Sequence, residues 1–188
     1  MSLSETNKRT NLAKYNNNRY QPGPTWKRAT WLIINTVFFN NGFAVFNTLK
    51  CGLLRIFGAK VGRRVVIKPS VNIKYPWFLV IGNDAWIGEK VWIDNLAMVS
   101  VGNDVCVSQG AFLMTGNHNY KKTTFDLMLG PVVLEDGVWI GANATVCPGV
   151  ICKTHAVLTA GSVATKSLEP YSIYQGVPAE KIKIRNIG

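Results

Sequence analysis

The stretch LEDGVWIGANATVCPGVICKTHAVLTAGSVA, residues 134–164, repeats every six residues. Each block of six opens on an aliphatic or thiol side chain, at Leu134, Ile140, Val146, Cys152 and Leu158. The fifth place of each block holds a small or β-branched residue, at Val138, Ala144, Val150, Ala156 and Ser162. A period of six fits neither the 3.6-residue period of a helix nor the alternation of a strand, so this stretch is a repeat.

Such a period predicts a parallel β-helix, in which each unit is one short strand and a turn. Three units make one triangular coil of about 18 residues. We expect the opening aliphatic residue to point into the prism and the fifth residue to be small because the walls crowd there. Since hydrogen bonds run from coil to coil, the stack shares one continuous core.

The same register extends toward the N-terminus through VGRRVV (61–66), IGNDAW (81–86) and VGNDVC (101–106), and it lasts to about Thr165. It breaks twice, at an insertion of two residues (Val99 and Ser100) and over residues 117–130, which we expect to form a loop leaving one corner. The sequence therefore divides into an extended polar arm (1–28), an amphipathic helical segment (29–58), the β-helix (59–168) and a C-terminal tail (169–188).

The N-terminal third precedes the repeat and contains an apolar run, WLIINTVFF. We expect Thr25 to cap a helix that begins at Trp26, followed by one or two amphipathic helices up to Phe57. Asparagines interrupt the run before about 20 apolar residues, and no cleavage site follows it, so neither a membrane span nor a signal peptide is expected. Covering the open end of the solenoid is the favoured role; contact with another subunit and binding to a membrane surface are the alternatives.

Charge is unevenly distributed along the chain. Residues 1–74 hold 13 lysines and arginines and one acid, whereas residues 75–188 hold 8 basic and 9 acidic residues. The basic residues are not interleaved with aromatic residues, which argues against nucleic acid; an anionic membrane face, a polyanionic partner or a solvated tail fits better. The four cysteines form no CxxC pair, which indicates no disulfide or zinc site and agrees with a reducing cytoplasm.

Several motifs together resemble the hexapeptide-repeat acyltransferases of left-handed β-helix fold: IGNDAW-IGEKVW, IGANATVCPGV, TAGSVATKSLEP and QGVPAEKIKIR. The lead-in RATW…LLRIFGAKVG and the motif TGNHNY are similar to exopolysaccharide, colanic-acid-type sugar O-acetyltransferases. The resemblance implies an all-β solenoid of left-handed coils. It also implies a homotrimer with acetyl-CoA bound between subunits, and direct acetyl transfer to a sugar hydroxyl without a metal.

His118 follows Thr115-Gly116-Asn117 where the repeat breaks into the long loop. Acetyl transfer to a hydroxyl needs a general base with a pKa near neutrality, and imidazole provides one. A surface histidine would be the ordinary interpretation, but the TGNH context favours the catalytic base, with a backbone N–H stabilising the oxyanion. His155, the second histidine, is expected to be an exposed turn residue. Two histidines cannot complete the three-histidine zinc site of the carbonic-anhydrase relatives.

By the same resemblance, Asp94 and Asn95 at the first break are predicted to bind acceptor hydroxyls, with capping of their own loop an equal alternative. Asp126 in the long loop is predicted to bind the acceptor or to orient the histidine. On the donor side, the residues that match cofactor-binding positions are Ala142, Ala160, Thr165, Lys166 and Lys183. Glu180 departs from the basic residue that the family sometimes has, and each lysine could equally be solvated.

The leading interpretation is an acetyl-CoA-dependent O-acetyltransferase of exopolysaccharide biosynthesis, cytoplasmic or peripheral at the inner membrane face, acting on a sugar or a lipid-linked saccharide. A second interpretation is acetylation of a free sugar, an antibiotic or a nucleotide-sugar amine. A third, of another class, is a non-catalytic β-helix scaffold. His118, the two breaks and TAGSVATK argue against the scaffold.

Overall fold

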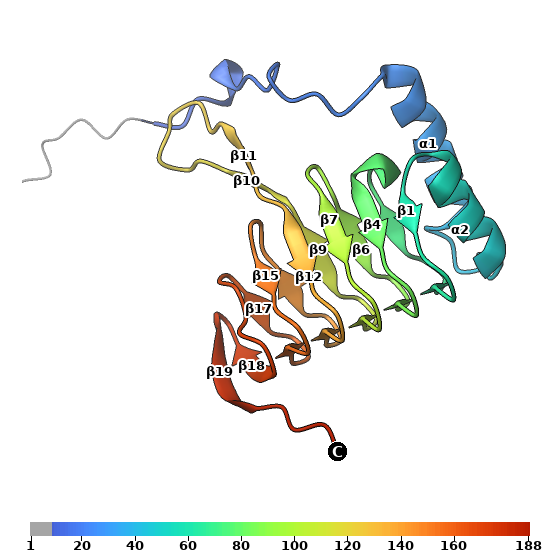
Figure 1. Cartoon of the computed structure of the whole chain (residues 1–188). Coiled ribbons are helices and arrows are strands. Elements are labelled where there is room, and N and C mark those ends of the chain that lie inside the picture. Colours follow the sequence, from blue (N-terminus) through green and yellow to red (C-terminus); the bar gives the residue numbers. More distant parts are fainter. Residues whose placement is uncertain (1–8) are drawn as a thin grey trace, which may run out of the picture.

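The computed structural model describes residues 9–188, so the first eight residues of the predicted arm lie outside the described part of the chain. Residues 60–176 wind into the predicted left-handed parallel β-helix. Two helices, α1 (Thr25–Phe38) and α2 (Asn47–Ile56), lie against its N-terminal end. The arm runs from α1 along the outside of the coils to a hairpin that projects from the solenoid (Figure 1).

Three parallel sheets form the walls of the prism. The first sheet contains β1 (Lys60–Val61), β4 (Leu79–Ile81), β7 (Val99–Val101), β12 (Val132–Leu134) and β15 (Ile151–Cys152). The second contains β2 (Val66–Ile67), β5 (Trp86–Ile87), β8 (Cys106–Val107), β13 (Trp139–Ile140), β16 (Val157–Leu158), β18 (Ser172–Gly176) and β19 (Ala179–Ile184). The third contains β3 (Asn72–Ile73), β6 (Trp92–Asp94), β9 (Phe112–Met114), β14 (Thr145–Val146) and β17 (Val163–Ala164).

Burial confirms the six-residue register. The opening residues from Ile67 to Ala164 are buried, and so are the fifth-place residues from Val65 to Ser162. The fourth place has a further property that the sequence analysis did not identify: its backbone turns into the left-handed region with φ between 54° and 81°, whether the residue is glycine, as at Gly110, or not, as at Asp104 and Asn143. Glycine, asparagine and aspartate tolerate this conformation best, which explains why they recur between the apolar positions.

Every departure from the repeat lies at one corner, where the third sheet leads into the first. The first coil inserts the 3₁₀ helix η2 (Pro76–Phe78) here, the second inserts residues 95–98, and the third inserts residues 115–131. The two-residue insertion therefore belongs to the turn before β7, and Val99 itself is a buried strand residue paired with Leu79. We call this edge of the prism the insertion corner.

The two helices cover the open end of the first coil, which confirms the favoured role of the helical segment. Trp31, Phe39 and Leu54 are buried in the same core as the first coil. The predicted cap is wrong by one position: Thr25 is the first residue of α1, and its hydroxyl accepts a hydrogen bond from Arg28 Nη2 at 3.0 Å instead of capping the helix. Pro24 precedes the helix with φ −59°, a value that suits the entry into a helix.

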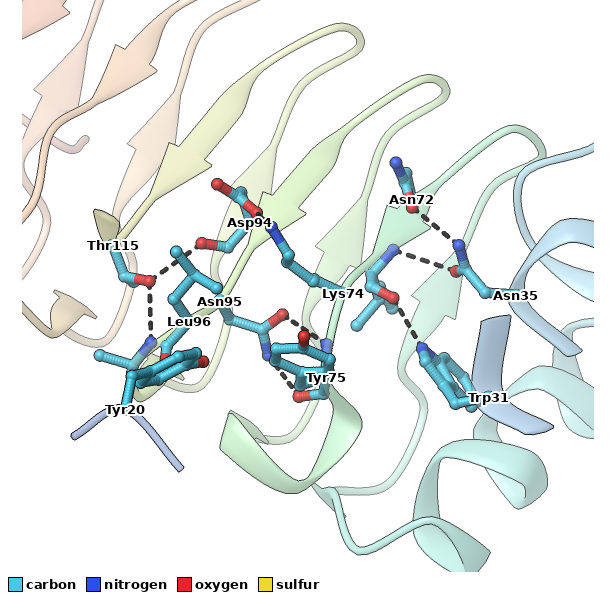
Figure 2. Close-up of polar contacts among 12 residues, drawn as sticks. Tyr20, Trp31, Asn35, Asn72, Lys74, Tyr75, Asp94, Asn95, Leu96 and Thr115 are labelled. Carbon is cyan, nitrogen blue, oxygen red and sulfur yellow. Dashed lines mark hydrogen bonds and ion pairs between the residues drawn. The ribbon is translucent and has the colours of Figure 1, made fainter. Parts of the chain in front are cut away.

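Side chains of these helices also satisfy the backbone edge that the first coil leaves unpaired. Trp31 Nε1 donates to Ile73 O at 2.7 Å, and Asn35 Oδ1 accepts from Ile73 N (Figure 2). Asn47 makes the corresponding pair of bonds, to Val65 O and from Ile67 N, each at 2.8 Å. Lys50 Nζ donates to Ile67 O and Lys68 O, and burial lowers the pKa of Lys50 to about 8. An open edge that would otherwise invite pairing with another chain is closed by side chains.

At the opposite end, the predicted C-terminal tail forms a pair of antiparallel strands, β18 and β19, that extends the second sheet (Figure 1). Ser172 is paired with Ile184 and Gly176 with Ala179, and β18 continues the parallel pairing from β16. Within residues 9–188, no helix has the length and apolar composition needed to cross a membrane.

Candidate functional site

His118 lies on a β-hairpin that projects from the insertion corner. The predicted loop 117–130 is more ordered than expected: β10 (Gly116–His118) and β11 (Leu127–Leu129) pair as antiparallel strands, with His118 opposite Leu127. The hairpin begins directly after Thr115, whose buried hydroxyl donates to Asp94 O and accepts from Ala97 N. The base of the hairpin is therefore fixed to the preceding coil.

The imidazole of His118 is held in one orientation by its own hairpin. Its Nδ1 lies 2.9 Å from Phe125 O, and its ring stacks on the Phe125 ring with centroids 4.5 Å apart and planes 8° from parallel. A carbonyl oxygen can only accept a hydrogen bond, so Nδ1 carries the proton. This tautomer leaves the Nε2 lone pair free to accept a proton, which is the state a general base requires.

The N-terminal arm crosses the insertion corner and reaches the histidine. Trp77 Nε1 donates to Pro22 O, the Tyr20 hydroxyl donates to Leu96 O at 2.8 Å, and Asn11 N donates to Thr123 O at 2.8 Å. Burial raises the pKa of Tyr20, so its hydroxyl remains a donor. One arm thus contacts all three insertions in turn, and sequence reasoning missed this because each contact joins residues more than 50 positions apart.

Tyr15 of the arm meets His118 edge to face, with ring centroids 5.6 Å apart and planes at 61°. Next to these two residues, which do not line it themselves, the arm and the hairpin form an open cavity of about 740 Å³. Its lining combines amides and charged groups with two leucines: Asn16, Asn17, Asn18, Arg19, Tyr20, Gln21, Lys122, Asp126, Leu127 and Leu129. Such a mixture of planar amides, charges and apolar surface can bind a molecule that carries many hydroxyls.

The predicted acceptor residues separate into two roles. Asn95 is buried, and its amide donates to Tyr75 O and Phe78 O and accepts from Tyr75 N, so it caps the η2 turn of the preceding coil and offers no free group to a sugar (Figure 2). Asp94, one position earlier on β6, is largely buried: its side chain is 17% exposed, and its Oδ1 lies 2.9 Å from Lys74 Nζ. The capping alternative therefore holds for Asn95, whereas Asp94 forms an ion pair with Lys74 and remains a predicted acceptor contact.

Asp126 lines the arm cavity and does not contact His118. Its carboxylate accepts a hydrogen bond from Lys122 Nζ at 2.8 Å, and this bond lowers the pKa of Asp126. The group that orients the histidine is the carbonyl of the preceding residue, Phe125, and not the Asp126 carboxylate. A backbone carbonyl carries no sequence signature, so no pattern could have identified it.

A second hollow, of about 340 Å³, lies at the corner where the second sheet leads into the third. Two predicted donor residues, Ala142 and Ala160, line it together with Ser108, Gln109, Trp139, Gly141, Val157, Leu158 and Thr159. A Cβ added to Gly141 would lie 2.5 Å from Ala160 N of the next coil, so position 141 cannot carry a side chain. We call this hollow the small-residue groove; a narrow, flexible ligand can lie along such a wall.

The remaining predicted donor residues lie outside this groove. Thr165 and Lys166 follow β17 of the third sheet, and Lys183 is on β19, where it pairs with Ile173. All three are exposed, so each is accessible to a ligand, but the lining of the groove does not include them.

His155 is a turn residue, as predicted, but it is half-buried and not exposed. Its backbone has φ 57°, its ring stacks on Tyr171 with centroids 4.8 Å apart, and its Nδ1 lies 3.0 Å from Thr154 Oγ1. Within residues 9–188, no three histidine, cysteine, aspartate or glutamate side chains are grouped as a metal site would require.

The base and the small-residue groove occupy different corners of one subunit. His118 follows the third sheet, whereas Ala142 and Ala160 precede it. In the third coil, Gly110 lies at the corner of the groove and Thr115 at the insertion corner. The five residues of extended chain from one to the other span roughly 17 Å. The third sheet lies between them, so a single subunit does not bring the histidine and the groove together.

Comparisons with known proteins were made for the whole chain. No family model matches it. The chain is 34% identical over 166 residues to the putative colanic acid biosynthesis acetyltransferase WcaF of Escherichia coli K12, covering 88% of this chain and 91% of that protein. It is 52% identical over 113 residues to a probable macrolide acetyltransferase of Lysinibacillus sphaericus, covering 53% and 63% of the two chains.

A solved structure extends the comparison to the fold. It is a hexapeptide-repeat-containing acetyltransferase from Vibrio cholerae in complex with acetyl-CoA, and it superposes with a TM-score of 0.77 at 20% identity. The match covers 86% of this chain and 88% of that one, so nearly the whole solenoid is shared.

Proposed function

Because this chain belongs to the hexapeptide-repeat acetyltransferases, and is therefore an acetyl-CoA-dependent acyltransferase, we propose that it acetylates a hydroxyl group of a sugar in polysaccharide biosynthesis, with His118 as the general base. The observation that carries the proposal is the fixed tautomer of His118, whose Nε2 is free while Nδ1 donates to Phe125 O. A sugar acceptor is supported by the similarity to WcaF over 88% of the chain and by the amide-rich cavity beside the histidine.

The reaction then follows from the positions of these groups. His118 Nε2 accepts the hydroxyl proton as the sugar oxygen forms a bond to the acetyl carbonyl carbon. The carbon–sulfur bond of the thioester breaks, and the sulfur leaves with the proton that the imidazole returns. No side chain of the protein forms a covalent bond to the acetyl group.

On the acceptor side, we propose that the sugar lies in the cavity between the arm and the hairpin. Asn16, Asn17 and Asp126 offer amide and carboxylate groups to vicinal hydroxyls, and Leu127 offers an apolar surface to a sugar face. Asp94 is the further acceptor residue on the third sheet, and Asn95 is not retained.

On the donor side, we propose that the pantetheine arm of acetyl-CoA lies along the small-residue groove, at Ala142 and Ala160. The exposed positions Thr165, Lys166 and Lys183 remain proposed contacts of the nucleotide end, where a cation would pair with phosphate. Since the groove and the base lie on different corners, we propose a homotrimer in which the groove of one subunit faces His118 of the next.

Substituting Ala160 by tryptophan should fill the groove and raise the KM for acetyl-CoA by more than about tenfold, because the bulky ring occupies the space of the donor. The alanine is exposed, so folding should be unaffected. Steady-state kinetics at saturating sugar measure the effect, and Ile187→Trp, at an exposed position outside the lining, is the control.

The Ala160→Trp variant also tests whether one active site combines the groove of one subunit with His118 of the next. At an acetyl-CoA concentration far below the raised KM, Ala160→Trp and His118→Asn subunits each have little activity alone. They should regain part of the activity when they are unfolded and refolded as a mixture, since some interfaces then combine an intact groove with an intact histidine. If the mixture stays as inactive as its components while mixed oligomers form, the two groups act within one subunit and the proposed arrangement fails.

Substituting Tyr15 by alanine should lower kcat/KM for the sugar by about three- to tenfold, since an aromatic pair contributes about 0.5–1.5 kcal/mol. The KM for acetyl-CoA should not change, because the groove is elsewhere. Tyr15→Phe should retain activity because it keeps the ring. Tyr120→Ala, on the same hairpin and well exposed, is the control; an equal loss in both alanine variants would refute a specific role for Tyr15.

The similarity to a macrolide acetyltransferase supports one second candidate, acetylation of an antibiotic hydroxyl. The base and the groove would serve both reactions, so the acceptor decides between them. Release of free CoA should depend on a saccharide under the first proposal and on a macrolide under the second.

A further inference from the structure

The helical end of the molecule exposes a dense apolar surface. The residues of this apolar cap face come from α1, α2 and the loop between them: Trp26, Leu32, Ile33, Val37, Phe38, Phe43, Val45, Phe46, Leu49 and Ile56. Phe43 is 90% exposed and Phe46 is 70% exposed, so neither side chain contributes to the packing of the isolated chain. Val37, Phe38, Phe43, Phe46 and Leu49 line one hollow of about 200 Å³, so these side chains form one continuous apolar surface, and such a surface marks an interaction site.

Capping of the solenoid does not account for these side chains. The faces of α1 and α2 that cover the first coil use other residues, such as Trp31, Phe39 and Leu54, all of them buried. Phe43 and Phe46 lie in the loop between the helices and are not part of the buried core. The molecule is therefore folded with two apolar faces on its cap, and only one of them is covered.

The charge of the residues around the apolar cap face indicates what kind of partner could cover it. Residues 25–78, which form the helices and the first coil, contain nine lysines and arginines, one of them the buried Lys50, and no aspartate or glutamate. Arg55, Lys60 and Arg63 are exposed next to α2. Arg55 donates only to the neutral carbonyls of Val61 and Gly62, so its charge is not paired.

We infer that the apolar cap face docks on the surface of an anionic phospholipid bilayer. Its aromatic and aliphatic side chains would enter the boundary between headgroups and acyl chains, while the surrounding cations meet anionic headgroups. Neither α1 nor α2 can cross a bilayer, so the contact is interfacial. Residues 75–188 carry 8 basic and 9 acidic residues, so the positive charge of the folded body is concentrated at its helical end. The arm, with three further cations, leads away from α1 to the hairpin (Figure 1).

This contact uses neither His118 nor the small-residue groove, so it stands or fails independently of the proposed reaction. The test is co-sedimentation of the full chain with vesicles of phosphatidylglycerol and phosphatidylcholine, compared with vesicles of phosphatidylcholine alone. Binding should require phosphatidylglycerol and weaken as salt is added, because surface charges are screened.

The decisive variant is Phe43→Asp with Phe46→Asp, which should weaken vesicle binding by more than about tenfold, since two phenyl rings no longer leave water. The matched control is Ile184→Asp with Ile187→Asp, which adds the same charge at two exposed isoleucines in the C-terminal segment. It should bind nearly as well as the unchanged protein. Thermal unfolding of both variants verifies that they remain folded.

Two outcomes would overturn the inference. One is that the unchanged protein does not bind the anionic vesicles, or that both double variants bind equally well. The other is that the unchanged protein does not bind vesicles and forms a larger oligomer, whereas the variant with aspartate at Phe43 and Phe46 does not form it. In that case the apolar cap face is a contact between copies of this chain.

Discussion

Substitution of His118 by asparagine is expected to slow acetyl transfer by about 10²–10⁴-fold, the range that a positioned general base contributes. Asparagine keeps the polarity and approximate size of the side chain, but its amide cannot accept and return a proton. Acetyl-CoA should bind with unchanged affinity because the groove at Ala142 and Ala160 lies on another corner. The measurement is the rate of free CoA release with a saccharide acceptor, together with calorimetric binding of CoA.

His155→Asn is the matched control for this experiment. His155 is the second histidine of the chain, but it packs on Tyr171 in a turn of the solenoid and not on the hairpin. It should retain most of the activity. If His118→Asn releases CoA as fast as the unchanged enzyme, another group removes the proton, and the role proposed for His118 is wrong.

Substitution of Asn47 by alanine is expected to lower the free energy of unfolding by about 2–4 kcal/mol. The asparagine amide satisfies both Val65 O and Ile67 N at the open edge of the first coil. Removing it leaves a donor and an acceptor without their partner, and each such group costs about 1–3 kcal/mol where water cannot replace the partner. Urea unfolding followed by circular dichroism measures the difference.

Asn40→Ala controls for the loss of an asparagine in the same helical segment, because Asn40 is exposed at the end of α1. It should change the free energy of unfolding by less than about 0.5 kcal/mol. Equal effects of the two substitutions would show that the edge contacts of Asn47 are replaced by water and that the cap does not close the edge as described.

The six-residue period predicted the walls of the solenoid because burial follows it directly. Ile87 and Leu113 point inward for the same reason as Ile140, and one repeat fixes the register of the others. The sheets, their order and the covering of the first coil by helices followed from the same argument. The left-handed backbone at the fourth place was also encoded, in the asparagines, aspartates and glycines that recur there.

Only part of the candidate site could be predicted, because some of its groups are side chains in short motifs and others belong to the backbone. His118 and the small residues Ala142 and Ala160 carry chemical signatures within short motifs. The amide of Asn95 was misleading, because the same side chain can cap a turn or bind a sugar hydroxyl. The Phe125 carbonyl belongs to the backbone, and any residue could supply it.

The arm was predicted as an extended polar segment without a role. Its contacts with Leu96 and Thr123 join residues 76 and 112 positions apart. Polar segments carry no periodicity from which such partners could be inferred, so only the three-dimensional structure reveals that Tyr15 reaches the histidine.

The path of the arm also sets an order of events in synthesis. The arm is among the first parts of the chain to be made, yet its last partner, the hairpin around Thr123, exists only after two coils have formed. Contacts so distant in sequence form late, because the chain between them must first be ordered. A nascent chain therefore carries its histidine before the arm is in place, and the proposed acceptor cavity is completed only when the arm, which precedes the coils in the chain, packs on the hairpin last.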